Sequence, residues 1–230
     1  MNELSAQILR DETDAGTAGE QAYDRLRADI VFGRLQPGQR LKLERLRLDY
    51  GVGISTLREI LNRLVPEGLV VAEGQRGFQV APCSAADLKE IAALRLLLEC
   101  HAMEQSFQAG DMEWEGRVVA AHHKLARMEA QLLAGDRSNA EPWKRYDWEF
   151  HQALVSACGS RALLGLHSGV YDLYLRYQMV FVIFRGEIAA DEHRALLDAA
   201  LNRQSARAQE ILSAHIWGCV DFALNRGLSS

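Results

Sequence analysis

Residues 51–82 read GVGISTLREILNRLVPEGLVVAEGQRGFQVAP, and this stretch decides the fold of the N-terminal part of the chain. Its aliphatic residues repeat at i, i+3, i+4 and i+7, the spacing of one buried helix face. These are Leu57, Ile60, Leu61 and Leu64. We therefore predict a helix from Ser55, as its N-cap, to Leu64, ended by the Pro66 to Gly68 turn. The runs LVVAE and GFQVA, separated by residues 74–77, predict a β-hairpin.

Two more helices are predicted before this stretch. One runs from Glu20 to Phe32 and ends at Gly33, and the other runs from Leu43 to Tyr50 and ends at Gly51. Helix, helix, turn, helix and hairpin is the order of a winged helix-turn-helix, a DNA-binding fold. We predict this domain over residues 20–82. The polar residues 1–19, rich in Gly, Thr and Ala, are expected to form a flexible arm.

The charge distribution supports this division. The chain carries a net charge of −5, yet residues 20–82 hold ten Arg and Lys against eight Asp and Glu, a net charge of +2. Residues 1–19 have a net charge of −3 and residues 83–230 a net charge of −4. The basic segment is therefore where a phosphate-binding surface is expected.

After Pro82 nearly the whole chain has helical periodicity, with breaks at glycines. We predict a mainly α protein in which residues 83–230 form an all-helical domain, a six-helix antiparallel bundle. The predicted helices cover residues 85–108, 112–134, 141–157, 161–183, 187–202 and 204–225.

Four polar residues lie on helix faces that are otherwise apolar: Asp147, His151, His193 and His215. Asp147 and His151, at i and i+4, are neighbours on one helix face. Burying each of these groups without a partner would cost on the order of 2–7 kcal/mol. Together they could hold a divalent metal and leave positions open for a ligand. For any single histidine, the alternative is a hydrogen-bonded core residue.

The exposed side of the helix over residues 55–64 carries Ser55, Thr56 and Arg58, which could reach base edges and phosphates in a major groove. Arg76, at the hairpin tip, could reach a phosphate or the minor groove. The alternative is the solvated face of a small helical domain.

The segments ADIVFGRLQPGQRL (residues 28–41), GVGISTLREILNRLVPEGLV (residues 51–70) and RGFQV (residues 76–80) resemble the winged helix-turn-helix of GntR-family bacterial transcription regulators. The resemblance implies operator contacts by six residues: Arg45, Ser55, Thr56, Arg58, Arg76 and Gly77. The chain departs from the family at Gly53-Ile54, where Ser/Thr-Arg is usual. Base discrimination would then fall on Arg58, Thr56 and Arg45.

The segments DWEFH (residues 147–151), EHRALLDAA (residues 192–200) and SAHI (residues 213–216) are similar to the metal-binding set of the FCD domain, the all-helical effector domain of one branch of that family. The resemblance implies that Asp147, His151, His193 and His215 are metal ligands. Such a donor set suits Zn²⁺, with Ni²⁺ or Mn²⁺ as competitors. A small carboxylate effector would take the open positions, with Arg95 and Arg176 as candidate contacts. For Arg95 the alternative is an internal salt bridge.

Three classes of function are consistent with these residues. The first is a metabolite-responsive regulator, a repressor by the usual logic of the resembled family, which binds a palindromic operator as a homodimer. The second is a helical interaction module with a structural metal. The third is a metalloenzyme, which the residues disfavour because no general base accompanies the ligand set. No signal peptide or membrane span is expected, and four cysteines without CxxC spacing indicate reduced thiols in a cytoplasmic protein.

Overall fold

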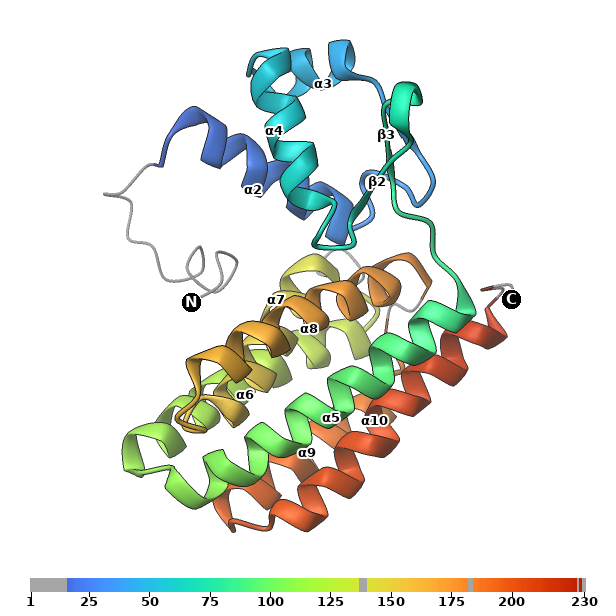
Figure 1. The fold of residues 1–230 in the computed structure, drawn as a ribbon. Helices are drawn as coiled ribbons and strands as arrows, with labels where there is room; N and C mark the ends of the chain where they lie inside the picture. The colour runs from blue at the N-terminus through green and yellow to red at the C-terminus, as the bar shows by residue number, and fades with distance from the viewer. Residues whose placement is uncertain (1–15, 137–139, 182–183, 227, 229–230) are drawn as a thin grey trace.

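The computed structural model describes residues 16–136, 140–181, 184–226 and 228. Three helices and a small sheet lie on one side of an elongated helical bundle, to which a single extended segment connects them (Figure 1). The mainly α architecture agrees with the sequence prediction, while most of the expected arm, residues 1–15, lies outside the described residues.

The three N-terminal helices are α2 (Ala18–Val31), α3 (Leu43–Tyr50) and α4 (Ile54–Leu64). Helix α2 begins two residues before the predicted start because Thr17 and Glu20 form a capping box. The predicted N-cap of α4 was wrong: Gly53 occupies that position and Ser55 lies in the first turn. The four predicted aliphatic residues of α4 are all buried.

The hairpin consists of β2 (Val70–Ala72) and β3 (Phe78–Val80), antiparallel, with Val70 opposite Val80. A single 3-10 turn, Gly74–Arg76, forms the tip. A third strand, β1 (Arg40–Leu41), pairs with the other edge of β3 and gives the strand order β1-β3-β2. This strand was not predicted because two residues are too few to show an alternating pattern.

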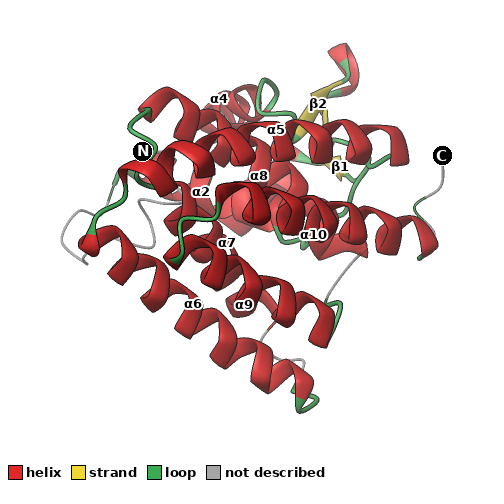
Figure 2. Ribbon diagram, turned by 90° about the horizontal axis from the view of Figure 1, so that it is seen from below, coloured by secondary structure: helices red, strands yellow, loops and turns green. Residues whose placement is uncertain are grey.

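Within the described residues the bundle contains six helices, whose bounds lie within two residues of the predicted ones; the predicted end of one of them, residue 183, lies outside the described residues. They are α5 (Ala85–Ala109), α6 (Met112–Leu133), α7 (Ala140–Val155), α8 (Arg161–Phe181), α9 (Glu187–Leu201) and α10 (Ser205–Asn225). Helix α5 packs against α8 and α10, while α6 packs against α7 and α9 (Figure 2). None of the described helices combines the length and the apolar character that a membrane span needs. All four cysteines are free thiols.

The two domains share part of a hydrophobic core. Trp148 of α7 and Tyr171 and Leu175 of α8 belong to the apolar cluster of the N-terminal domain, although they come from the bundle. Between the domains, the guanidinium of Arg27 on α2 forms a buried ion pair with Asp172 on α8, at 2.6 Å. The face of α8 toward the N-terminal domain is therefore an interdomain contact.

Candidate metal centre

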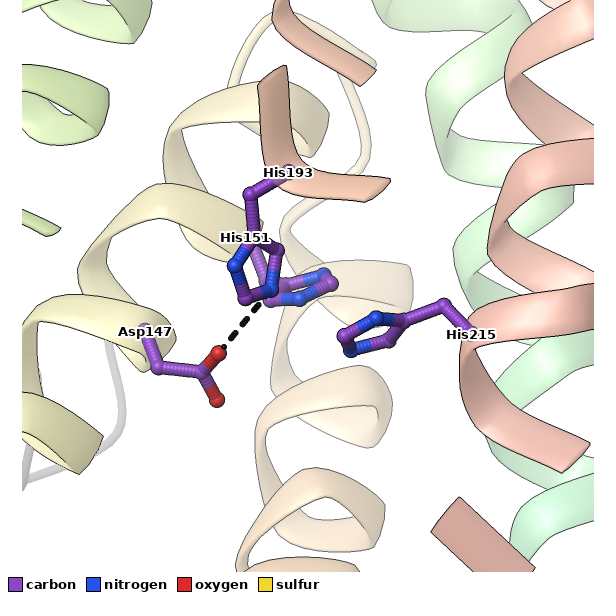
Figure 3. A group of neighbouring side chains, drawn as sticks. All are labelled: Asp147, His151, His193 and His215. Atoms are coloured by element: carbon purple, nitrogen blue, oxygen red, sulfur yellow. Dashed lines mark ion pairs between the residues drawn. The ribbon is translucent and has the colours of Figure 1, made fainter. Parts of the chain in front are cut away.

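Asp147 and His151 on α7, His193 on α9 and His215 on α10 meet inside the bundle (Figure 3). Each offers one ligand atom, and these atoms all lie within 4.8 Å of one another. All four residues are buried, with no more than 2% of their surface exposed. The structure thus brings together the four residues that the sequence singled out.

A glutamate fixes the orientation of each imidazole. Glu129 contacts Nδ1 of His193 at 2.6 Å, Glu192 contacts Nδ1 of His215 at 2.7 Å, and Glu99 contacts Nδ1 of His151. A carboxylate that binds one ring nitrogen directs the other nitrogen toward a metal and raises its basicity. These three glutamates come from α6, α9 and α5, and none of them was predicted from the sequence.

Hydrogen bonds to one of its two carboxylate oxygens fix the orientation of Asp147. Its Oδ2 accepts hydrogen bonds from the Tyr171 hydroxyl, at 2.7 Å, and from the Lys144 ammonium, at 3.1 Å. Its Oδ1 lies 3.2 Å from Nε2 of His193. One carboxylate oxygen is therefore anchored, and the other faces the histidines.

Nε2 of His215 is buried at this shared space and has no hydrogen-bond partner among the described residues. Oδ1 of Asp147 and Nε2 of His193 also make no hydrogen bond there, but they lie 3.2 Å apart as an ion pair when His193 is protonated. Unpaired buried polar atoms are costly and call for an explanation. A divalent cation supplies one, because a carboxylate oxygen and neutral imidazole nitrogens are its usual protein ligands. The residues present therefore fit a metal.

The three histidines of the candidate centre differ in pKa because their surroundings differ. Burial lowers the pKa of His215 to about 3 and also lowers the pKa of His151. Burial opposes the charge of His193 too, but the carboxylates of Asp147 and Glu129 outweigh it and raise that pKa to about 9. In the metal-free protein His193 therefore retains a proton that a metal must displace.

The candidate effector residue Arg95 lies beside this centre. Its Nε donates to Glu99 at 2.9 Å, so the internal salt bridge considered as the alternative is present. Its Nη2 lies 3.2 Å from Nδ1 of His151, and its guanidinium packs over the rings of Tyr171 and Tyr174. Its Nη1 is buried without a hydrogen-bond partner among the described residues.

The structure does not bring Arg176 to the centre. Its Nη2 donates to the backbone carbonyls of Ala81 and Pro82, in the segment that connects the two domains, and contacts Sγ of Cys83. Arg176 therefore fastens the interdomain connection to α8. This contact joins residues more than ninety positions apart, so no local pattern in the sequence could have indicated it.

A small cavity adjoins the ligand set. Its walls include Asp147, His193 and His215, together with three polar residues that the sequence analysis did not single out: Lys144, Gln178 and Arg185. Lys144 stands three residues before Asp147, a helical spacing that could have identified it. Arg185 lies in the connection between α8 and α9, where periodicity gives no signal.

The residues expected to contact DNA are accessible on the N-terminal domain. Arg45 on α3, Ser55 and Arg58 on α4, and Arg76 at the hairpin tip are exposed. Thr56 and Gly77 are half-buried. The face of α4 that carries Ser55 and Arg58 lies opposite the buried apolar face of the same helix. The helix can therefore present polar side chains to a partner while its apolar face stays packed.

A three-helix domain with a β-hairpin wing, joined to an all-helical domain with a buried His/Asp cluster, is the architecture of a DNA-binding regulator with a second, helical domain. Comparison with known proteins agrees. Residues 18–80 match the family model for bacterial regulatory proteins of the gntR family, and residues 90–217 match the model for the FCD domain. The chain belongs to the GntR family, in the branch that carries an FCD domain, and it is a DNA-binding transcription regulator rather than an enzyme.

The relatives span most of the chain. It is 38% identical to the HTH-type transcriptional regulator BphR of Paraburkholderia xenovorans, described as uncharacterized, over 91% of this chain and 86% of that one. It is 32% identical to the HTH-type transcriptional repressor GlaR of Escherichia coli, over 84% and 90% of the two chains. The fold resembles the solved structure of Escherichia coli McbR/YncC, with a TM-score of 0.73 and 20% identity over 92% and 99% of the two chains.

Proposed function

We propose that this regulator is a repressor that senses a small carboxylic acid through a divalent metal and binds a palindromic operator as a homodimer. One observation carries the metal part of the proposal. Three imidazoles have Nδ1 bound by a glutamate, and their rings converge with the Asp147 carboxylate. Among the described residues, the buried Nε2 of His215 has no hydrogen-bond partner, and the buried Nε2 of His193 has only Oδ1 of Asp147 beside it, at 3.2 Å. Without a metal, these buried polar atoms would lack a ligand, and that would cost free energy.

Zn²⁺ is the metal that we favour, because it binds imidazole and carboxylate ligands and has no strong preference of geometry. Ni²⁺ and Mn²⁺ are the competitors. Asp147, His151, His193 and His215 would hold the ion, and a larger coordination number would leave positions for an acid. The bound metal would supply a fixed positive charge to an acid's carboxylate. Arg95, whose buried Nη1 has no hydrogen-bond partner in the part of the chain that the structure describes, would add a second cation near that position.

On the DNA side, we propose that α4 enters the major groove and that the hairpin tip contacts the backbone. Ser55, Thr56 and Arg58 lie at or near the N-terminal turn of α4, which is the part of a recognition helix that reaches base edges. Arg45 and the tip residues Arg76 and Gly77 would contact phosphates or the minor groove. A homodimer would place two such helices on two half-sites.

A structural metal is the second candidate role for the centre, favoured by its complete burial. In that case metal removal would unfold the bundle, and no acid would bind. The two roles differ in their response to ligand, which makes them separable by one experiment.

The test is a thermal-shift screen of the metal-loaded chain against mono- and dicarboxylic acids, with metal-stripped protein as control. Ligand at about 100 times its Kd should add about 2.7 kcal/mol of stability, and only when the metal is present. The same acid should release the protein from its operator. If a fully metal-loaded protein showed no shift with any acid, the structural role would be supported instead.

A further inference from the structure

We propose that Arg185 is the residue that grips the carboxylate of the metal-bound acid. This inference rests on the proposed function, because it assigns a contact to the acid in the same cavity. Arg185 lies in the cavity wall together with His193, His215 and Asp147, so its guanidinium faces the space in which a ligand of the metal would sit.

The guanidinium of Arg185 is nearly buried, with 9% of its side chain exposed. It forms an ion pair with Glu192, which is also the carboxylate that orients His215, and its Nη2 donates to the backbone carbonyl of His215 at 3.2 Å. Its Nε is buried and has no hydrogen-bond partner among the described residues. A donor on this cavity-lining residue therefore remains available for an anionic oxygen.

Gly218 on α10 makes room for this guanidinium. A Cβ atom at position 218 would lie 2.7 Å from Nη1 of Arg185, which is closer than real Cβ contacts allow. Gly218 stands three residues after His215, so it shares the helix face that carries this ligand. The position of Arg185 over the metal centre thus depends on a residue without a side chain.

The charges of the buried cluster favour an anion. Four carboxylates surround the histidines: Asp147, Glu99, Glu129 and Glu192. Three cations, Arg95, Lys144 and Arg185, balance three of those charges, and a divalent ion against the fourth leaves one excess positive charge. Buried net charge is costly, so the metal-loaded site is completed by an anionic ligand.

The size of the cavity indicates how the acid enters. The space that it offers to a water molecule is about 10 Å³, which is room for about one water molecule. Side chains that line the cavity must therefore move before an acid can fit. Among the lining residues, Arg185 lies in the connection between two helices and not in a helix. We infer that its guanidinium moves from Glu192 toward the acid, while Glu192 continues to hold His215.

The test uses the full-length chain loaded with Co²⁺, whose visible spectrum reports on its ligands, and acetate as the probe. Acetate should change the spectrum saturably in the unaltered protein. Arg185→Gln should weaken the acetate affinity by about tenfold to a hundredfold, the range for a hydrogen bond to a charged group. Gly218→Ala should weaken it in the same direction by displacing the guanidinium. Arg194→Gln and Gly116→Ala, which alter an exposed arginine and an uncrowded helical glycine, are the matched controls.

The outcomes separate the proposals. Equal acetate affinity in Arg185→Gln and the unaltered chain would overturn the role of Arg185 and leave the metal sensor intact. A Co²⁺ spectrum that acetate does not change would overturn the carboxylate part of the proposed function. Failure of the unaltered chain to take up Co²⁺ would overturn the metal centre itself. A loss of Co²⁺ in Arg185→Gln alone would show that Arg185 serves the metal ligands and not the acid.

Discussion

The three histidines of the centre have defined ring orientations because Glu99, Glu129 and Glu192 each bind an Nδ1 atom. The sequence predicted that Asp147 and the three histidines lie together in the interior, since polar groups on apolar helix faces are unusual, but it did not predict these glutamates. Glutamate is common on solvated helix faces, and each of these lies more than twenty residues from its histidine. Only the packing of α5, α6 and α9 brings them into contact.

The first prediction at the residue scale concerns this support. Glu129→Gln removes the charge that makes His193 a better ligand and keeps the size of the side chain. We expect metal affinity to fall by about tenfold to a hundredfold, as for other residues that support metal ligands. Competition with a chromophoric chelator measures it. Glu149→Gln, which alters a surface partner of Lys124, is the control, and equal losses in both variants would contradict the role of Glu129.

The second prediction concerns the protonation of His193 and its effect on metal affinity. In the metal-free chain His193 has a pKa of about 9, against an ordinary value of 6.5. A raised histidine pKa stabilises the folded metal-free chain fully below about pH 6.5, and the contribution is lost as the pH rises through about 9. Since a metal displaces this proton, metal affinity should rise about tenfold per pH unit between about pH 7 and 9. Calorimetry in two buffers at about pH 7.5 should find about one proton released per ion, and no release would contradict the assignment.

At the scale of elements, the helices could be predicted because each has a continuous apolar stripe. The strand β1 could not be predicted, because two residues are too few to show a pattern. The contacts of α8 with the N-terminal domain could not be predicted either, because periodicity does not identify the partner of a buried face. Trp148, Tyr171 and Leu175 complete the core of the other domain, and no local pattern in the sequence indicates that contact.

The exposed face of α4 carries the third prediction. Arg58→Ala should weaken operator binding by about 1–3 kcal/mol if Arg58 contacts a base, and it should relax the preference at one base pair. Binding to the operator and to substituted operators, at fixed salt, measures both effects. A loss that is uniform across all sequences would indicate a phosphate contact instead.

The fourth prediction concerns the ion pair between Arg27 on α2 and Asp172 on α8. Arg27→Met would leave Asp172 buried without its charge partner, so we expect a loss of about 3–5 kcal/mol in stability. Arg27→Met combined with Asp172→Leu removes both charges and should cost much less. Urea unfolding of the two single variants and the double variant gives the coupling energy. Additive losses would contradict the importance of this ion pair.

On the scale of the whole molecule, α8 connects the candidate metal centre with the DNA-binding domain. The hydroxyl of Tyr171 holds Asp147, and the next residue, Asp172, binds Arg27 of the N-terminal domain. Arg176, one turn further on, holds the connecting segment. A displacement of Asp147 when an acid binds would therefore reach the N-terminal domain through a single helix.

The fifth prediction follows from that path. Tyr171→Phe removes the hydrogen bond to Asp147 but retains the aromatic ring in the shared core. We expect metal and operator to bind nearly as before, while the acid changes operator affinity less than in the unaltered chain. Operator titrations with and without the acid give this coupling free energy, typically about 1–3 kcal/mol in allosteric proteins. An unchanged coupling would exclude Tyr171 from the path.

The most direct test of the metal centre is a measurement of metal content combined with X-ray absorption on the full-length, untagged protein. We predict one divalent ion per chain, bound by nitrogen and oxygen ligands, with imidazole nitrogens at about 2.0–2.1 Å for zinc, and loss of that ion in His193→Ala. A protein that folds and binds its operator without a stoichiometric metal, or an ion bound through cysteine sulfur, would contradict the account.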